Sequence, residues 1–145
     1  MKIKDILQDK GNKVITTVPN TTIWEALTEI IENKVGSLVV LDESERLLGI
    51  ITERDVMRVI YQRRDLKQET VGDHMTTEVT TGQLEDWIET VMDRMTHGRY
   101  RHMPVVENDK LVGLVSIGDT VKAQLDHAKV QVIQLREYIG GPVPN

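Results

Sequence analysis

Two short segments of the chain carry a hydroxyl and a carboxylate at a spacing that suits two kinds of chemistry. Thr52-Glu53-Arg54-Asp55 and Ser116-Ile117-Gly118-Asp119 each place the acid three residues after the hydroxyl. As a capping box, the hydroxyl accepts a hydrogen bond from the backbone N–H of the acid, and the carboxylate accepts one in return. As a ligand site, the carboxylate accepts from both hydroxyls of a sugar, and the helix N-terminus suits a phosphate. The spacing alone allows either role, or both.

The densest basic stretch runs from Gly98 to Pro104 and includes Arg99, Arg101 and His102. A guanidinium presents a planar fork of donors that matches phosphate oxygens, so this stretch suits an anionic ligand. The alternative is a solvated loop without a ligand. The first half of the chain has no equal counterpart, because residues 35–39 contain neither a cation nor a proline.

Other chemistry finds little support in the sequence. Cysteine is absent, which excludes disulfides, thiol catalysis and thiolate metal sites. The four histidines show no metal-ligand spacing, and there is no nucleophile elbow or glycine-rich phosphate loop. We therefore expect no enzymatic activity and no metal requirement.

The composition is that of a soluble globular protein. Of 145 residues, 39% are hydrophobic and 28% charged, and the net charge of −5 repels phosphate backbones, so nucleic acid is not expected as the main partner. A small nucleotide needs only a local cluster of cations. No apolar run is long enough to cross a bilayer, and the first residues lack a signal-peptide core. We therefore expect a cytoplasmic protein with no membrane partner.

The sequence contains an internal duplication. Three blocks recur in the same order, and the longest follows the pattern basic, Leu, apolar, Gly, apolar, apolar, hydroxyl, any, any, Asp without a gap. The longest block is residues 46–55, which matches residues 110–119 at a shift of 64. The other two blocks have a shift of 65: residues 14–16 match 79–81, and residues 38–42 match 103–107.

Each copy predicts the order strand, helix, strand, strand, helix. In the first copy these are a strand at 14–18, a helix after it, a hairpin of strands 37–41 and 47–52, and a helix from Glu53 toward Arg64. The predicted helices have apolar faces, and we expect both tryptophans to pack there. These faces carry Trp24, Leu27, Ile30 and Ile31 in the first helix of the first copy, Val56, Val59 and Ile60 in its second helix, and Trp87, Ile88, Val91, Met92 and Met95 in the first helix of the second copy. Either copy alone buries little surface, so the two copies are expected to pack together.

The C-terminal region predicts one long helix from Asp119 to Ile139, stopped by Gly140-Gly141-Pro142. An apolar stripe near heptad spacing runs along it: Val121, Leu125, Ala128, Val132, Leu135 and Ile139. The stripe either packs on its own chain or forms a dimer or partner surface.

The element order, with a hairpin ending in Gly-apolar-apolar-[Thr/Ser]-x-x-Asp, resembles the cystathionine β-synthase (CBS) domain, and two copies in tandem resemble a CBS pair, or Bateman module. The resemblance covers residues 1–128 and implies an α+β fold of two βαββα units packed about a pseudo-twofold axis, plus the long C-terminal helix. The units are then residues 1–66 and 67–128, with a helix extension and tail at 129–145. The chain looks like a stand-alone member.

The resemblance also implies a function. Clefts between the units would bind an adenine nucleotide (AMP, ADP, ATP or NAD) or S-adenosylmethionine, and a homodimer would transmit the signal to an unidentified regulated protein. In the family, the acid binds ribose, basic residues before the strand of the second copy hold phosphates, and adenine lies along the first strand of each copy. Carried over, the candidate ligand-binding residues are Val14, Thr16, Gly36, Thr52, Arg54, Asp55, Val79, Thr80, Arg99, Arg101, His102, Met103, Pro104, Ser116 and Asp119.

Within this set, Thr80, Arg101, His102, Ser116 and Asp119 are expected to form the second site together. The first site is expected to differ from it, because no cation stands beside Gly36, although Arg54 partly compensates. The alternative function is a structural or adaptor dimer whose clefts have lost their ligand.

Overall fold

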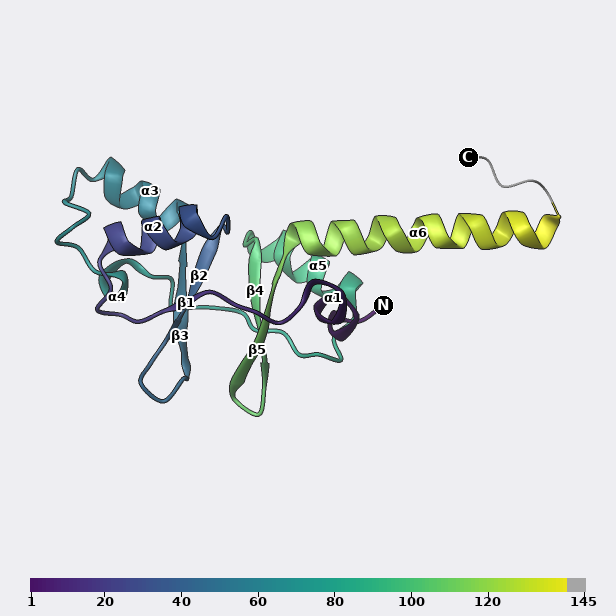
Figure 1. The fold of residues 1–145 in the computed structure, drawn as a ribbon, viewed down its shortest axis with the longest axis horizontal. Helices are drawn as coiled ribbons and strands as arrows, with labels where there is room; N and C mark the ends of the chain where they lie inside the picture. The colour runs from purple at the N-terminus through teal and green to yellow at the C-terminus, as the bar shows by residue number, and fades with distance from the viewer. Residues whose placement is uncertain (141–145) are drawn as a thin grey trace.

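The computed structural model describes residues 1–140, which form two small sheets, each with its own helices. In Figure 1 the two hairpins lie side by side with their turns at the same end, and the last helix extends far beyond the rest of the molecule. The elements are α1 (Ile3–Lys10), β1 (Thr16–Thr17), α2 (Ile23–Glu32), β2 (Ser37–Leu41), β3 (Leu47–Thr52), α3 (Glu53–Tyr61), α4 (Val71–His74), α5 (Ile88–Gly98), β4 (His102–Glu107), β5 (Lys110–Ser116) and α6 (Ile117–Ile139).

The duplication in the sequence is confirmed as a duplication of structure. Both hairpins, β2–β3 and β4–β5, are antiparallel, with a register shift at equivalent places, after Val40 and after Val105. At the start of α3 the N–H of Glu53 donates to the carbonyl of Gly36 (3.1 Å), and at the start of α6 the N–H of Ile117 donates to that of Arg101 (2.9 Å). The predicted α+β fold of two equivalent units is therefore correct.

The first strand of each unit is shorter than predicted. Residues 14–18 give only the two-residue β1, parallel to β2, and in the second unit Gly82 makes a single parallel bridge to Val105. The physical reason in the second unit is Pro104. The equivalent residue, Val39, donates its N–H to the carbonyl of Ile15 (3.2 Å), and proline has no N–H to donate.

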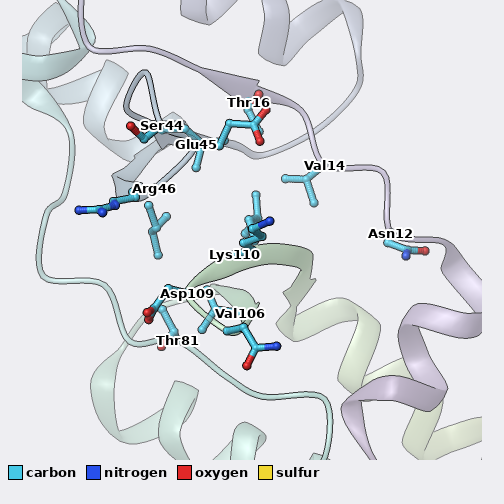
Figure 2. A pocket seen from close by; sticks show the side chains of 14 residues that line it. Asn12, Val14, Thr16, Ser44, Glu45, Arg46, Thr81, Val106, Asp109 and Lys110 are labelled. Atoms are coloured by element: carbon cyan, nitrogen blue, oxygen red, sulfur yellow. The ribbon is translucent and has the colours of Figure 1, made fainter.

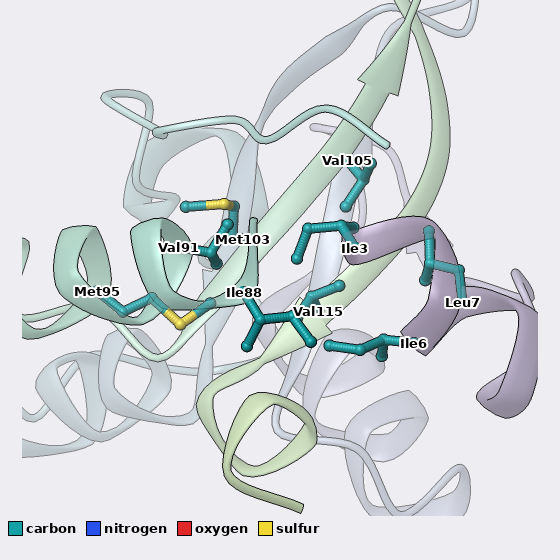
Figure 3. Close-up of a cluster of buried hydrophobic side chains, with 9 residues drawn as sticks. All are labelled: Ile3, Ile6, Leu7, Ile88, Val91, Met95, Met103, Val105 and Val115. Atoms are coloured by element: carbon teal, nitrogen blue, oxygen red, sulfur yellow. The ribbon is translucent and has the colours of Figure 1, made fainter. Parts of the chain in front are cut away.

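Each unit completes its core with the segment that precedes the other unit. Figure 3 shows α1 packed against β4, β5 and α5 of the second unit, where its Ile3, Ile6 and Leu7 are buried. In the first unit, Val71 of α4 is buried in the core beneath α2 and α3. Neither α1 nor α4 is among the predicted elements. The exchange means that residues at the start of the chain support residues more than a hundred positions later.

The predicted apolar faces of the helices are only partly buried. Ile23, Ala26 and Ile30 of α2 face the sheet, but Trp24 and Ile31, about a quarter-turn away around the helix, are 49% and 64% exposed. The expectation that both tryptophans pack in the core is therefore wrong. The ammonium of Lys67 lies 5.5 Å from the Trp24 ring centroid, and that of Lys2 lies 5.0 Å from the ring of Trp87, which precedes α5 rather than belonging to it.

On α3 the prediction is right for Val56 and Val59, which are buried, and wrong for Ile60, which is 53% exposed. Ile60 lies beside the exposed Met57 and Tyr61, so α3 continues the outward apolar surface of α2. The apolar side chains of α2 and α3 therefore extend beyond the faces that the core covers.

The long C-terminal helix is confirmed, starting at Ile117, two residues before the predicted position. It ends at Ile139, where Gly140 adopts a left-handed conformation (φ 77°) that caps the helix. Gly141 and Pro142 of the predicted stop, like the rest of the tail, lie outside the described residues. Within residues 1–140, no helix combines the length and the apolar character needed to cross a membrane.

Candidate functional site

One large cavity lies between the hairpin turns of the two units and has a volume of about 940 Å³. Figure 2 shows Val14 and Thr16, two of the candidate residues, facing the opposite turn across it. Each turn contributes one acid and one base: Glu45 with Arg46, and Asp109 with Lys110. Because these charges balance, the cavity offers no excess positive charge to a phosphate, and we do not regard it as the nucleotide site.

The smaller cavity, of about 480 Å³, lies between the units and gathers residues from both. Its volume falls in the usual range for small-molecule sites. Four arginines and three carboxylates line it, an excess of positive charge in a protein of net charge −5. Nine candidate residues meet here: Gly36, Thr52, Arg54, Asp55, Val79, Thr80, Arg99, Arg101 and His102.

Asp55 is the buried carboxylate of this cavity, with a side chain only 3% exposed. It forms the predicted capping box, since its Oδ2 accepts from the N–H of Thr52 (2.9 Å) and its own N–H donates to Thr52 Oγ1 (3.2 Å). Thr52 Oγ1 also lies 3.0 Å from Oδ2, and the contacts from outside the capping box are Arg58 Nη1 at 3.2 Å and Thr76 Oγ1 at 3.3 and 3.4 Å from the two carboxylate oxygens. Arg58 is 63% exposed, so sugar hydroxyls can replace these weaker donors without breaking the cap.

The basic stretch is held by the end of α5. Arg99 adopts a left-handed conformation (φ 56°) as the C-cap of α5, and so turns the chain toward β4. Arg101 is exposed at the cavity, and its carbonyl is fixed by the start of α6. Arg99 and Arg101 therefore line the same cavity as Asp55, although they come from the other unit.

His102 lies between the units. Burial lowers its pKa below the ordinary value, an effect that the nearby carboxylates of Glu53 and Asp119 oppose and the Arg101 guanidinium reinforces. The imidazole is therefore uncharged near neutral pH and acts as a hydrogen-bonding group rather than a fixed cation. A Cβ at Gly36 would lie 3.1 Å from Nε2 of His102, so glycine leaves the ring its place beside the cavity.

Ser116 and Asp119 form the equivalent capping box of the second unit, with Oδ2 of Asp119 accepting from the N–H of Ser116 (2.9 Å). Neither lines the cavity that holds Thr80, Arg101 and His102, although Ser116 pairs with His102 across β4 and β5 and the Asp119 carboxylate lies near enough to act on the His102 pKa. Instead, the ammonium of Lys10 lies 2.7 Å from Oδ2 of Asp119 and 2.9 Å from the carbonyl oxygen of Leu114.

Because of Lys10, the carboxylate of Asp119 has different partners from the carboxylate of Asp55. Burial by itself raises the pKa of Asp119, but the Lys10 ammonium and the N–H of Ser116 more than offset this and hold that pKa below its usual value. An acid whose pKa is lowered by folding contributes stability above its unfolded pKa, and this stability is lost as the pH falls through its folded pKa. The ion pair therefore adds to the packing of α1 against the second unit at neutral pH, and this contribution is lost in acid.

We expect Lys10→Met to lower the free energy of unfolding at pH 7 by up to about 1 kcal/mol, because the pair is partly exposed. The difference from wild type should vanish as the pH falls below the ordinary carboxyl range. Urea denaturation at a series of pH values measures this. Lys13→Met, which removes an equal charge nearby, serves as the control; an identical pH dependence for both variants would show that the pair contributes nothing.

The remaining candidates belong to the core. Met103 is fully buried among α5 and β5 side chains, and Pro104 is also buried, so both support the basic stretch from behind. Conversely, the cavity is lined by Arg58, Thr76 and Tyr100, which are not among the candidates. Arg58 could have been predicted from the sequence, because it lies one helical turn after Asp55 and side chains at that spacing are neighbours on a helix. Thr76 and Tyr100 carry no local signal, because only the packing of the units brings them here.

Among residues 1–140, no three histidine or carboxylate side chains gather in a way that could hold a metal ion. The hydroxyl of Tyr100 is buried beside the cavity and has no hydrogen-bond partner in the described part of the chain.

The repeated unit, the exchange of segments and the inter-unit cavity define a tandem pair of similar domains. The sequence profile of the CBS domain matches residues 3–62 and again residues 71–126, so the chain belongs to the CBS domain family. A relative from Arabidopsis thaliana, the mitochondrial CBS domain-containing protein CBSX3, is 36% identical over 96% of this chain and 72% of its own.

Solved structures agree with this fold. The CBS-domain containing protein ATU1752 of Agrobacterium tumefaciens has a TM-score of 0.81 and 42% identity, over 86% of this chain and 99% of its own. Two further neighbours were solved with adenosine compounds. PAE2072 of Pyrobaculum aerophilum carries AMP (TM-score 0.75, 27% identity, 82% and 89% coverage), and the CBS pair of MJ0100 carries 5′-methylthioadenosine and S-adenosyl-L-methionine (0.77, 28%, 89% and 98%).

Proposed function

We propose that this protein is a non-catalytic regulatory module that binds an adenine nucleotide in the cavity between its two units. The observation that carries the proposal is the meeting of Asp55, the segment Val79–Thr80 and Arg101 around one cavity of nucleotide size. Asp55 accepts from the ribose, the segment flanks the adenine, and the guanidinium groups bind phosphate. The AMP-bound neighbour supports this choice of ligand class.

A panel of AMP, ADP, ATP, NAD and S-adenosylmethionine tests the proposal by thermal shift. A ligand present at a hundred times its Kd stabilises the folded state by about 2.7 kcal/mol. For a chain of this length that corresponds to roughly 5–10 °C in Tm. Guanosine and cytidine nucleotides are the controls. If no adenine compound raises Tm at millimolar concentration, the cavity has lost its ligand and the adaptor function replaces this one.

Arg101→Ala should weaken AMP binding roughly five- to tenfold and leave adenosine almost unchanged, because the partner of the guanidinium is the phosphate. Calorimetric titration of AMP and adenosine measures both. Arg136→Ala removes the same charge from the distal part of α6 and should affect neither ligand. An equal loss for AMP and adenosine would mean that Arg101 acts on the shape of the cavity, not on the phosphate.

We also propose that the protein acts as a homodimer that passes ligand binding on to a regulated protein, with the cytoplasm as the expected location. Support comes from the large apolar side chains exposed on α2 and α3, including Trp24, Ile31, Met57, Ile60 and Tyr61, because a patch of exposed apolar side chains marks an interaction surface. Light scattering at tens of micromolar tests the dimer; a monomer with and without nucleotide would overturn it.

A further inference from the structure

Helix α6 carries a heptad repeat whose distal part is not covered by any other residue within 1–140. Val121, Ala128 and Leu135 alternate with Leu125, Val132 and Ile139 at strict spacings of four and three residues. Thr120 is buried and Ala123 packs on the core of the second unit, but from Leu125 onward every described residue of the helix is exposed. Figure 1 shows this half projecting away from both units.

An isolated helix as short as the projecting half is only marginally stable in water. We therefore infer that a partner covers its apolar stripe, which we call the seam. The repeat of 3.5 residues is the one that supercoils two helices. Leu125, Val132 and Ile139 occupy the a positions, two of them β-branched, and Leu135 occupies a d position. In parallel coiled coils, β-branched residues at a with leucine at d favour two strands.

The residues flanking the seam select the direction of pairing. On one side every e position is basic, with Lys122, Lys129 and Arg136, and on the other side the g positions are Gln124, Gln131 and Tyr138. In an antiparallel pair of identical helices e faces e, so cations would face cations along the whole seam, which is destabilising. In a parallel pair e faces g, so Lys129 meets Gln124 and Arg136 meets Gln131 of the second copy, without repulsion.

We propose that the distal half of α6 forms a parallel, in-register, two-stranded coiled coil with α6 of a second copy. The inference deepens the proposed homodimer and rests on it, because it assigns one part of the dimer surface and its direction. It is independent of the nucleotide site, since the projecting half lies outside the residues that line the cavity.

Single-cysteine variants test the proposal, since the chain has no cysteine of its own. Leu125→Cys, Val132→Cys and Ile139→Cys should each give a covalent dimer on oxidation or with a short bis-maleimide. Val130→Cys, on the opposite side of the helix, should give no covalent dimer under the same conditions. In an antiparallel pair centred on residue 130, the rise of 1.5 Å per residue would separate the two copies of residue 125 by about 15 Å and those of residue 139 by about 27 Å.

The outcomes are distinct. Cross-linking at all three seam positions supports the proposal, and cross-linking at Val132 alone overturns the parallel direction. A dimer by light scattering with no cross-link at any seam position overturns the coiled coil but leaves the homodimer standing; a monomer overturns both. Leu135→Asp gives a second readout. It should lower the helical circular-dichroism signal by the contribution of the distal half and leave any nucleotide-induced Tm shift unchanged. An unchanged helical signal counts against pairing along this seam.

Discussion

Asp55→Ala is expected to weaken AMP binding roughly 5- to 150-fold, the equivalent of about 1–3 kcal/mol for the loss of a buried charged acceptor. Of the two capping-box carboxylates, Asp55 is the one that lines the inter-unit cavity, and its contacts to Arg58 and Thr76 are long enough to be exchanged for ribose hydroxyls. Calorimetric titration with AMP measures the effect. Asp55→Asn, which keeps the size of the side chain, should fall between wild type and the alanine variant.

The internal duplication supplies a matched control, Asp119→Ala. Both variants remove the acid of a capping box and should lose about 1 kcal/mol of stability for that reason. Only Asp55 lines the cavity, so Asp119→Ala should bind AMP within about twofold of wild type. If Asp119→Ala instead loses the ligand and Asp55→Ala keeps it, the site belongs to the other carboxylate. If both bind normally, the motif serves only to cap helices.

Gly49→Ala is expected to cost about 1–3 kcal/mol of folding stability, as overpacking at a tight contact does. A Cβ on Gly49 would run into the backbone carbonyl oxygen of Thr76, which is fixed by a pair of 2.9 Å hydrogen bonds between Ile50 and Thr76. Backbone cannot swing aside as a side chain does. Urea denaturation measures the loss, and AMP affinity should fall too, because Thr76 also contacts Asp55.

Gly113, the equivalent glycine of the second unit, provides the comparison. There the atoms nearest to a Cβ, from 2.6 Å, belong to the Leu7 side chain, which is buried but can shift more easily than backbone. Gly113→Ala should therefore cost less than Gly49→Ala. Gly118→Ala, whose Cβ finds space at the start of α6, should be neutral or slightly stabilising. An equal cost at residues 49 and 113 would show that the segment around Thr76 yields as easily as a side chain.

Local signals in the chain were sufficient for the repeat, the hairpins and the two capping boxes. Thr52 to Asp55 and Ser116 to Asp119 form the predicted boxes because a cap depends on residues three apart, whatever lies around them. The basic stretch likewise stands where it was predicted, since the end of α5 and the start of β4 fix it locally. These features are short-range, and short-range chemistry can be read from spacing.

Long-range packing decided the rest. The sequence predicts two similar carboxylates, but only the tertiary structure shows that Lys10 pairs with Asp119 while a hydroxyl from residue 76 reaches Asp55. It also decided that α1 completes the core of the second unit, and that Trp24 and Trp87 face outward. The physical reason is the same in each case: a residue pattern determines which face of an element is apolar or charged, whereas the contact that face makes depends on segments far away in the chain.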